Sequence, residues 1–211
     1  MHSPPTFDYE RPLWKRGLRL VAGVDEVGRG PLAGPIVAAA VILPPGARFR
    51  WIRDVRDSKE LTAARREELA ERIRDKAIAF GLGSLPAERI DQLGIAAADR
   101  EAMARALAAL DPAAEFALID ALKLPNCCVP HQPIIDGDAL SLSIAAASIV
   151  AKVERDRMMA NYDILYPGYG FAKHKGYSTA AHMRALAERG PCPIHRRSFA
   201  PVRDCVVVEA S

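Results

Sequence analysis

The chain has few cysteines and no long apolar run, and both absences narrow what it can be. Its four cysteines, in 211 residues, include no C-x-x-C pair. The sequence therefore offers no zinc site of the usual spacing and no disulfide framework of the kind that small secreted proteins use. The longest purely aliphatic run, residues 36–43, is far shorter than the ~18 residues of a membrane span. Because the amino terminus also lacks the apolar core of a signal peptide, we expect a cytoplasmic protein without a membrane partner.

Neither sign of charge dominates. With 29 Lys and Arg against 26 Asp and Glu, the net charge is +3, a mild basic bias that is compatible with a polyanionic partner but does not establish one. Half of the residues are hydrophobic, so a chain of this length can bury a core as one domain. We expect a flexible leader over residues 1–17, a single domain over 18–205 that includes a helical C-terminal part, and a tail over 206–211.

The hydrophobic pattern alternates between strand and helix after an initial hairpin. Strands are predicted over 19–27 and 34–43, and the short gap between them indicates an antiparallel pair. Further short strands are predicted at 115–119 and 133–135. Helices are predicted over residues 62–80, with Thr62 as the N-cap, over 95–110 and 141–162 and, capped by Ser178 or Thr179, up to residue 189. This alternation favours an α/β domain with a mixed sheet.

Acidic residues follow several of the predicted strands. Asp25 and Glu26 end the first strand, Asp120 ends a later one, and Asp138 precedes the longest helix. If these strands are neighbours, the carboxylates converge, and clustered carboxylates need cations because they repel one another and lose hydration. Ligands that are all oxygen favour Mg²⁺ or Mn²⁺, and two such ions ~4 Å apart suit phosphodiester hydrolysis. Alternatively, Asp138 only caps the helix that follows it, and Asp136 competes with it for any role.

The segment Gly28-Arg29-Gly30 follows the carboxylate pair directly. Two glycines allow positive φ and a close approach to a ligand, and successive exposed N–H groups can bind an anion or a hydroxyl. The alternative is an ordinary hairpin turn with a surface arginine. A dinucleotide-binding loop is not indicated, because Pro31 and a second strand come next instead of the G-x-G-x-x-G spacing and a helix.

Two polar sets are candidate phosphate contacts. Ser148, Lys152 and Arg155 stand at i, i+4 and i+7 of the longest helix and so share one face. Ser58 and Lys59 lie in the loop before the first long helix. Each set could equally be a solvated polar surface.

The C-terminal third is rich in basic and aromatic residues. One glycine-rich loop contains His174, Lys175 and Tyr177. Carboxylates with metal ions need no histidine base, so three other histidines are interpreted as structural: His131, His182 and His195. Four arginines make this part basic and suit non-specific contact with a nucleic-acid backbone: Arg184, Arg189, Arg196 and Arg197.

Four segments, in the same order across residues 18–200, resemble bacterial ribonuclease HII, the type 2 ribonuclease H. They are GVDEVGRGPLAGP, DSKEL, GDALSLSIAAASIVAKVERDR and YPGYGFAKHKGYST. The resemblance implies an RNase H-like fold, with a mixed five-stranded sheet flanked by helices and a helical C-terminal extension. It also implies an endoribonuclease that cleaves the RNA strand of RNA–DNA hybrids and incises 5′ of single ribonucleotides in duplex DNA, leaving a 3′-hydroxyl and a 5′-phosphate.

The resemblance assigns roles to individual residues. It implies that two Mn²⁺ or Mg²⁺ ions are held by four catalytic carboxylates: Asp25, Glu26, Asp120 and Asp138. It implies that the backbone of Gly28, Arg29 and Gly30 contacts the ribose 2′-hydroxyl and that Tyr177 packs against the next sugar. It favours phosphate contacts for four residues: Ser58, Lys59, Ser148 and Lys152. Small departures from the family pattern occur at Val27 and Ala121, where many relatives have alanine and glycine.

The resemblance also bears on partners. It implies RNA–DNA hybrid or ribonucleotide-containing duplex DNA as substrate, with roles in ribonucleotide excision repair and DNA replication. We expect a monomer, and association with a sliding clamp is doubtful because the sequence shows no C-terminal motif of the kind that recruits a clamp in some relatives. The alternatives are a related metal nuclease restricted to long hybrids and a non-catalytic hybrid-binding protein, although the presence of all four carboxylates opposes the second.

Overall fold

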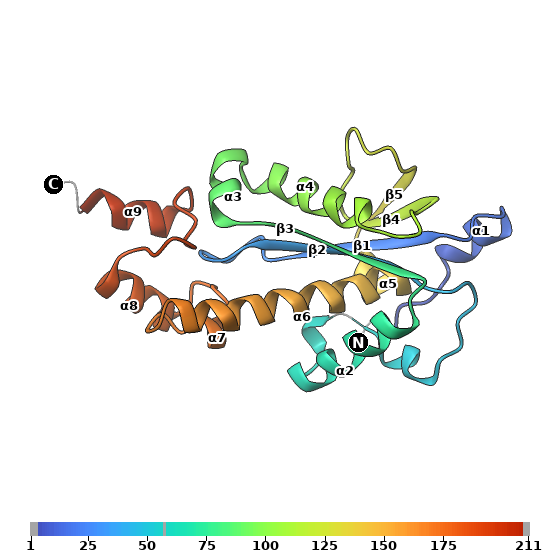
Figure 1. Cartoon of the computed structure of the whole chain (residues 1–211), viewed down its shortest axis with the longest axis horizontal. Helices are drawn as coiled ribbons and strands as arrows, with labels where there is room; N and C mark the ends of the chain where they lie inside the picture. Colours follow the sequence, from blue (N-terminus) through green and yellow to red (C-terminus); the bar gives the residue numbers. More distant parts are fainter. Residues whose placement is uncertain (1–3, 57, 209–211) are drawn as a thin grey trace.

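The computed structural model describes residues 4–56 and 58–208 and centres on one five-stranded sheet of order β3-β2-β1-β4-β5 (Figure 1). Strands β1, β2 and β3 pair antiparallel, whereas β4 lies parallel to β1 and β5 parallel to β4. The strands are β1 (Val21–Val27), β2 (Ile36–Ile42), β3 (Ala79–Leu85), β4 (Phe116–Asp120) and β5 (His131–Ile134). The predicted mixed five-stranded sheet and its opening hairpin are confirmed.

The sheet is covered on both faces. Helix α4 (Ile95–Ala108), with α3 (Ala87–Leu93), packs on one face, and the long helix α6 (Leu142–Leu165) packs on the other (Figure 1). This sandwich explains why every residue of β2, IVAAAVI, is buried, as expected of a strand without a solvent face. Helix α6 lies so close to β1 that a Cβ at Gly23 would be 2.0 Å from the carbonyl carbon of Ser143.

Short elements connect this framework. The 3₁₀ turns η1 (Arg50–Asp54) and η2 (Ser58–Glu60) lead into α2 (Ala63–Lys76), which packs against α6. Helix α2 begins where the sequence predicts, because the Thr62 hydroxyl accepts a hydrogen bond from the Arg65 N–H. One turn of helix, α5 (Gly137–Leu140), precedes α6.

The C-terminal helices gather at the end of the sheet where β1 turns into β2 (Figure 1). They are α7 (Phe171–His174), α8 (Ala180–Arg189) and α9 (Ala200–Val208). An antiparallel bridge between Ala33 and His195 joins the hairpin turn to this part. The predicted tail over 206–211 needs correction, because α9 continues through Val208. Residues 209–211 lie outside the described residues.

The prediction of a flexible leader over residues 1–17 is wrong for residues 7–15, whereas residues 1–3 lie outside the described chain. Helix α1 (Glu10–Lys15) packs on the domain, with Phe7 and Leu13 buried. The buried Glu10 carboxylate accepts hydrogen bonds from the Ser141 hydroxyl (2.7 Å) and the Ser143 N–H (3.0 Å) at the start of α6. These contacts join residues more than 130 positions apart in the sequence, and they order a segment that was expected to be flexible.

Within the described residues, none of the helices combines the length and the apolar character that crossing a bilayer demands.

Candidate active site

Three carboxylates meet at one edge of the sheet. Asp25 and Glu26 end β1, and Asp120 ends β4, its parallel neighbour. One oxygen from each carboxylate lies within 4.8 Å of the other two. In the described part of the chain, no other group of three or more His, Cys, Asp or Glu residues is close enough to hold a metal ion. The arrangement follows from topology, because parallel neighbours end at the same edge.

Asp138 lies next to this cluster, in the first turn of α5. The Asp120 carboxylate accepts a hydrogen bond of 2.7 Å from the Gly137 N–H and so ties the start of α5 to the end of β4. The charge of Asp138 raises the pKa of both Asp25 and Asp120. The alternative role for Asp138, capping the long helix, is wrong because the Ser141 hydroxyl caps α6.

The electrostatics of the cluster call for a cation. Burial, followed by the charges of Glu26 and Asp120, raises the pKa of Asp25 well above its ordinary value of 3.8. Burial and the charge of Asp120 likewise raise the pKa of Glu26, and burial and Asp138 raise that of Asp120. Among the described residues, no donor reaches the buried Glu26 Oε2. A divalent ion would neutralise the charges and occupy this oxygen, so the donor set fits Mg²⁺ or Mn²⁺.

Sequence reasoning missed a fifth acidic residue. Asp99 lies on α4, is fully buried, and places Oδ2 3.2 Å from Arg29 Nε. Burial, with the charge of Glu26, raises the pKa of Asp99 to about 7, while Arg29 lowers it. Arg29 Nη1 also lies 4.0 Å from Glu26 Oε1. The available signal was the position of Asp99, which shares the buried helix face of Ala102 and Met103, where a lone acid is unusual.

The Gly28-Arg29-Gly30 turn lies beside the cluster and needs glycine at its first position. Gly28 has φ +103°, and a Cβ there would lie 2.3 Å from Arg155 Nε. Arg29 and Gly30 are exposed, and a Cβ at Gly30 would lie 4.0 Å from Tyr177 Cε1. The structure therefore brings together the carboxylates, the turn and Tyr177, which is 43% exposed.

The candidate phosphate contacts occupy two different environments. Ser58 and Ser148 are buried, with their hydroxyl oxygens 3.1 Å apart, and the Ser148 hydroxyl lowers the pKa of Asp25 through a hydrogen bond. These two serines therefore support the carboxylate cluster. The charge of Lys59 lowers the pKa of Asp120, which places its ammonium near the same cluster.

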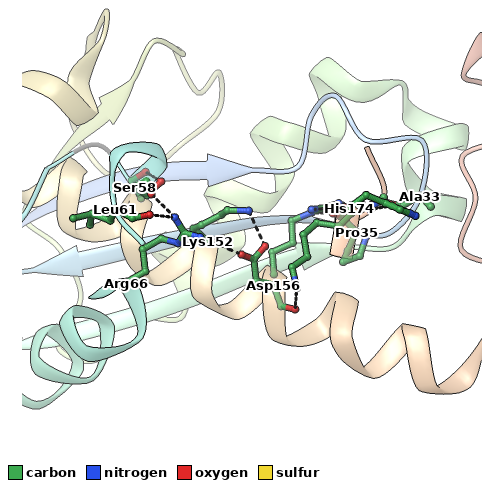
Figure 2. A network of polar contacts seen from close by, with 12 residues as sticks. Ala33, Pro35, Ser58, Leu61, Arg66, Lys152, Asp156 and His174 are labelled. Carbon is green, nitrogen blue, oxygen red and sulfur yellow. Dashed lines mark hydrogen bonds and ion pairs between the residues drawn. The ribbon is translucent and has the colours of Figure 1, made fainter. Parts of the chain in front are cut away.

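Lys152 instead lines an open groove of about 620 Å³ with Arg66, Lys173, Lys175 and Tyr177 among its walls. Its ammonium donates a hydrogen bond of 2.7 Å to Asp156, and Arg66 donates one of 2.8 Å to the Ser58 carbonyl (Figure 2). Basic side chains therefore line this groove up to Tyr177, together with the acidic Glu67 and Asp156.

Two arginines differ from their predicted surface roles. Arg155 and Arg196 are fully buried, so neither is a solvated phosphate contact. Each is turned inward because it donates hydrogen bonds to backbone carbonyls of the hairpin turn. The structural interpretation of His182 and His195 is consistent with their burial and with their Nε2 atoms 3.0 Å apart.

Comparison with known proteins agrees with this fold. The family model described as Ribonuclease HII matches residues 22–202. The ribonuclease HII of Dehalococcoides mccartyi is 52% identical over 199 residues, which cover 94% of each chain. The ribonuclease H2 structure from Pyrococcus horikoshii superposes with a TM-score of 0.77 at 26% identity, covering 90% of this chain and 99% of that one. RNase HII from Archaeoglobus fulgidus, solved in a complex with PCNA, gives 0.71 at 27% identity, covering 88% and 96%.

Proposed function

Because this chain belongs to the ribonuclease HII family and is an endoribonuclease of RNA–DNA hybrids, we propose that it also incises duplex DNA 5′ of single ribonucleotides. The reaction leaves a 3′-hydroxyl and a 5′-phosphate. The observation that carries this proposal is the cluster of three carboxylates with oxygens within 4.8 Å of one another, placed directly beside an exposed, glycine-framed turn.

In this proposal Asp25, Glu26 and Asp120 hold divalent metal, and Asp138 completes the site for a second ion. The raised pKa values of Asp25, Glu26 and Asp120 and the unpartnered Glu26 Oε2 support the assignment. Bound Mn²⁺ or Mg²⁺ supplies activation of water and stabilisation of the leaving oxygen. The protein holds the ligands in place through the Gly137 N–H on Asp120 and through the Ser148 hydroxyl on Asp25.

The turn and the groove define the substrate. The 2′-hydroxyl is the group by which a protein distinguishes RNA from DNA at one nucleotide, and the exposed backbone of Arg29 and Gly30 offers polar groups to it. Tyr177, next to Gly30, supplies an aromatic surface for the adjacent sugar. The basic side chains of the groove, which include Lys152 and Lys175, attract the phosphate backbone of the substrate electrostatically.

A cleavage assay tests the proposal. The protein is incubated with Mn²⁺ and three end-labelled duplexes of one sequence: one with a single ribonucleotide, one all-DNA and one a long RNA–DNA hybrid. We expect incision on the 5′ side of the single ribonucleotide and no incision of the all-DNA duplex. Cleavage of the long hybrid alone would reduce the function to that of a hybrid-restricted nuclease, and equal cutting of all-DNA duplex would refute sugar recognition.

A further inference from the structure

Two buried cations lie beneath the Gly28-Arg29-Gly30 turn. Arg155 comes from α6 and Arg196 from the loop after α8, and both side chains are fully buried. No carboxylate of the described chain lies within ion-pair distance of either guanidinium. Arginine stays protonated in proteins, so each buried charge depends on the carbonyl groups around it.

Arg196 directs its donors at the turn itself. Its Nη1 donates to the Arg29 carbonyl at 2.9 Å, and its Nη2 donates to the Gly28 carbonyl at 2.6 Å. Nε and Nη2 also bind the Gly34 carbonyl, at 3.0 and 2.9 Å. One planar side chain therefore holds three carbonyls that lie 162 to 168 positions earlier in the sequence.

These contacts fix the orientation of two peptide groups, and therefore also the direction of the N–H on the side opposite each carbonyl. In a trans peptide the C=O and the following N–H point in opposite directions. Since the Gly28 and Arg29 carbonyls point inward to Arg196, the N–H groups of Arg29 and Gly30 point outward. Neither N–H donates a hydrogen bond to any of the described residues. Both residues are exposed, and Gly30 lies beside Tyr177. A cation bound to the carbonyl also polarises the peptide group and strengthens its N–H as a donor.

We propose that Arg196 is the positioning residue for sugar recognition: by binding the Gly28 and Arg29 carbonyls, it aims two N–H donors at the ribose of the substrate. Arg196 does not touch the substrate and acts only through the turn. This inference rests on the proposed function, because it assigns the cause of the preference for a ribonucleotide. It predicts that loss of Arg196 impairs discrimination between sugars more than it impairs duplex binding.

Arg155 provides a matched control. It is equally buried, but it binds the carbonyls of Pro35 (2.9 Å), Lys175 (3.0 Å) and Ala33 (3.2 Å). None of these belongs to the two peptide groups whose N–H donors face outward. Arg155 also packs against Gly28, so replacing it removes a comparable buried guanidinium from the same turn without removing a donor from either of those peptide groups.

The experiment measures a preference, which a general loss of stability does not change. Fluorescence anisotropy gives the Kd for two duplexes of one sequence, with and without a single ribonucleotide. Ca²⁺ replaces the catalytic ion, because its larger and looser coordination shell disfavours catalysis. The preference is the ratio of the two Kd values, and thermal unfolding checks that each variant is folded. The variants are Arg196→Lys, Arg196→Met, Arg155→Lys and Arg155→Met.

We expect Arg196→Met to lower the preference about tenfold, Arg196→Lys to lower it less, and both to bind all-DNA duplex within about twofold of the parent. The Arg155 variants should lower the melting temperature and keep the preference. If Arg196→Met does not fold, Arg196→Lys carries the test. An unchanged preference in the folded Arg196 variants, or an equal loss in Arg155→Lys, would overturn the proposal. Absence of any preference in the parent protein would instead refute the proposed sugar recognition.

Discussion

The β1–β2 hairpin has a pair of buried arginines beneath its turn and a cluster of carboxylates at the end of β1. The arginines find hydrogen-bond partners within the protein, whereas the carboxylates do not. The two arginines beneath the turn donate seven hydrogen bonds to carbonyls, three from Arg155 and four from Arg196. Burial lowers the pKa of Arg155 to about 10 and that of Arg196 to about 9, so both remain charged at neutral pH. The carboxylates at the end of β1 have raised pKa values and an unpartnered oxygen.

This difference indicates that the arginines hold the structure of the turn, whereas the carboxylates form a binding site. A buried charge whose hydrogen bonds are all internal stabilises one conformation of the chain and needs no ligand. A buried group of like charges without internal compensation costs free energy until a counterion arrives. The hairpin therefore presents a turn held by internal hydrogen bonds and, separated from it by Val27, a negatively charged pocket that requires a cation from outside.

Removing one carboxylate should have the largest effect. Asp25→Asn deletes a charged ligand from the centre of the cluster, so we expect cleavage of the ribonucleotide duplex to fall more than about a hundredfold, beyond the loss typical of outer-sphere partners. Binding of the uncleaved duplex, measured by anisotropy, should persist. The control is Asp75→Asn, an exposed side chain near the end of α2, which should cleave normally. Normal cleavage by Asp25→Asn would remove Asp25 from the metal site.

Removing one buried arginine should affect stability instead. Arg155→Met leaves three carbonyls without their donor, and we expect a loss of about 3 kcal/mol in the free energy of unfolding, measured with urea. Arg157→Met, on the same helix, removes an exposed ion pair with Glu67 and should cost less than about 1 kcal/mol. Similar losses for the two variants would mean that the buried network contributes little.

In the absence of metal, the pH dependence of the free energy of unfolding should differ between the parent protein and Asp25→Asn. Since the pKa of Asp25 is raised in the folded state, the folded protein binds a proton more tightly, and this contribution to stability is lost as pH rises from about 4 through the raised pKa. Asp25→Asn lacks the effect, so its stability advantage over the parent should grow between pH 4 and pH 8. Unfolding in urea with a chelator measures this difference.

Two buried histidines contribute with the opposite sign. Burial lowers the pKa of His182, and that of His195 to about 4, so their contribution rises with pH below about 6.5. They are present in both proteins and cancel in the difference. Saturating Mn²⁺ should stabilise the parent and not the variant. A difference independent of pH would show that Asp25 is not perturbed.

Lys152→Ala should give the smallest effect. Its ammonium is already paired with Asp156, and burial lowers its pKa. Its electrostatic attraction for a phosphate group is therefore weakened. We expect KM for the duplex to rise about twofold to fivefold and its salt dependence to weaken slightly. Lys76→Ala, outside the groove on α2, is the control. An unchanged KM would place the nucleic-acid backbone away from Lys152.

Much of the fold and the centre of the site could be predicted from sequence, because these features depend on residues close together in the chain. The all-apolar run of β2 and the Thr62 cap were readable from local pattern, and so was the position of Asp25 and Asp120 at strand ends. Convergence of those ends required only that the strands be neighbours, which the register Val24↔Ile119 confirms.

The remaining features depended on tertiary contacts, since no local pattern reports what a distant segment will place beside a side chain. The helical pattern places Asp99 on the buried face of α4, but only the packed structure shows that its neighbours there are Arg29 and Glu26. Helix α1 is ordered only because Glu10 meets the start of α6. Sequence by itself determined which residues carry charge and where strands end. Only the tertiary structure decided which charges are neutralised internally, because the carbonyls that hold Arg196 lie more than 160 residues away.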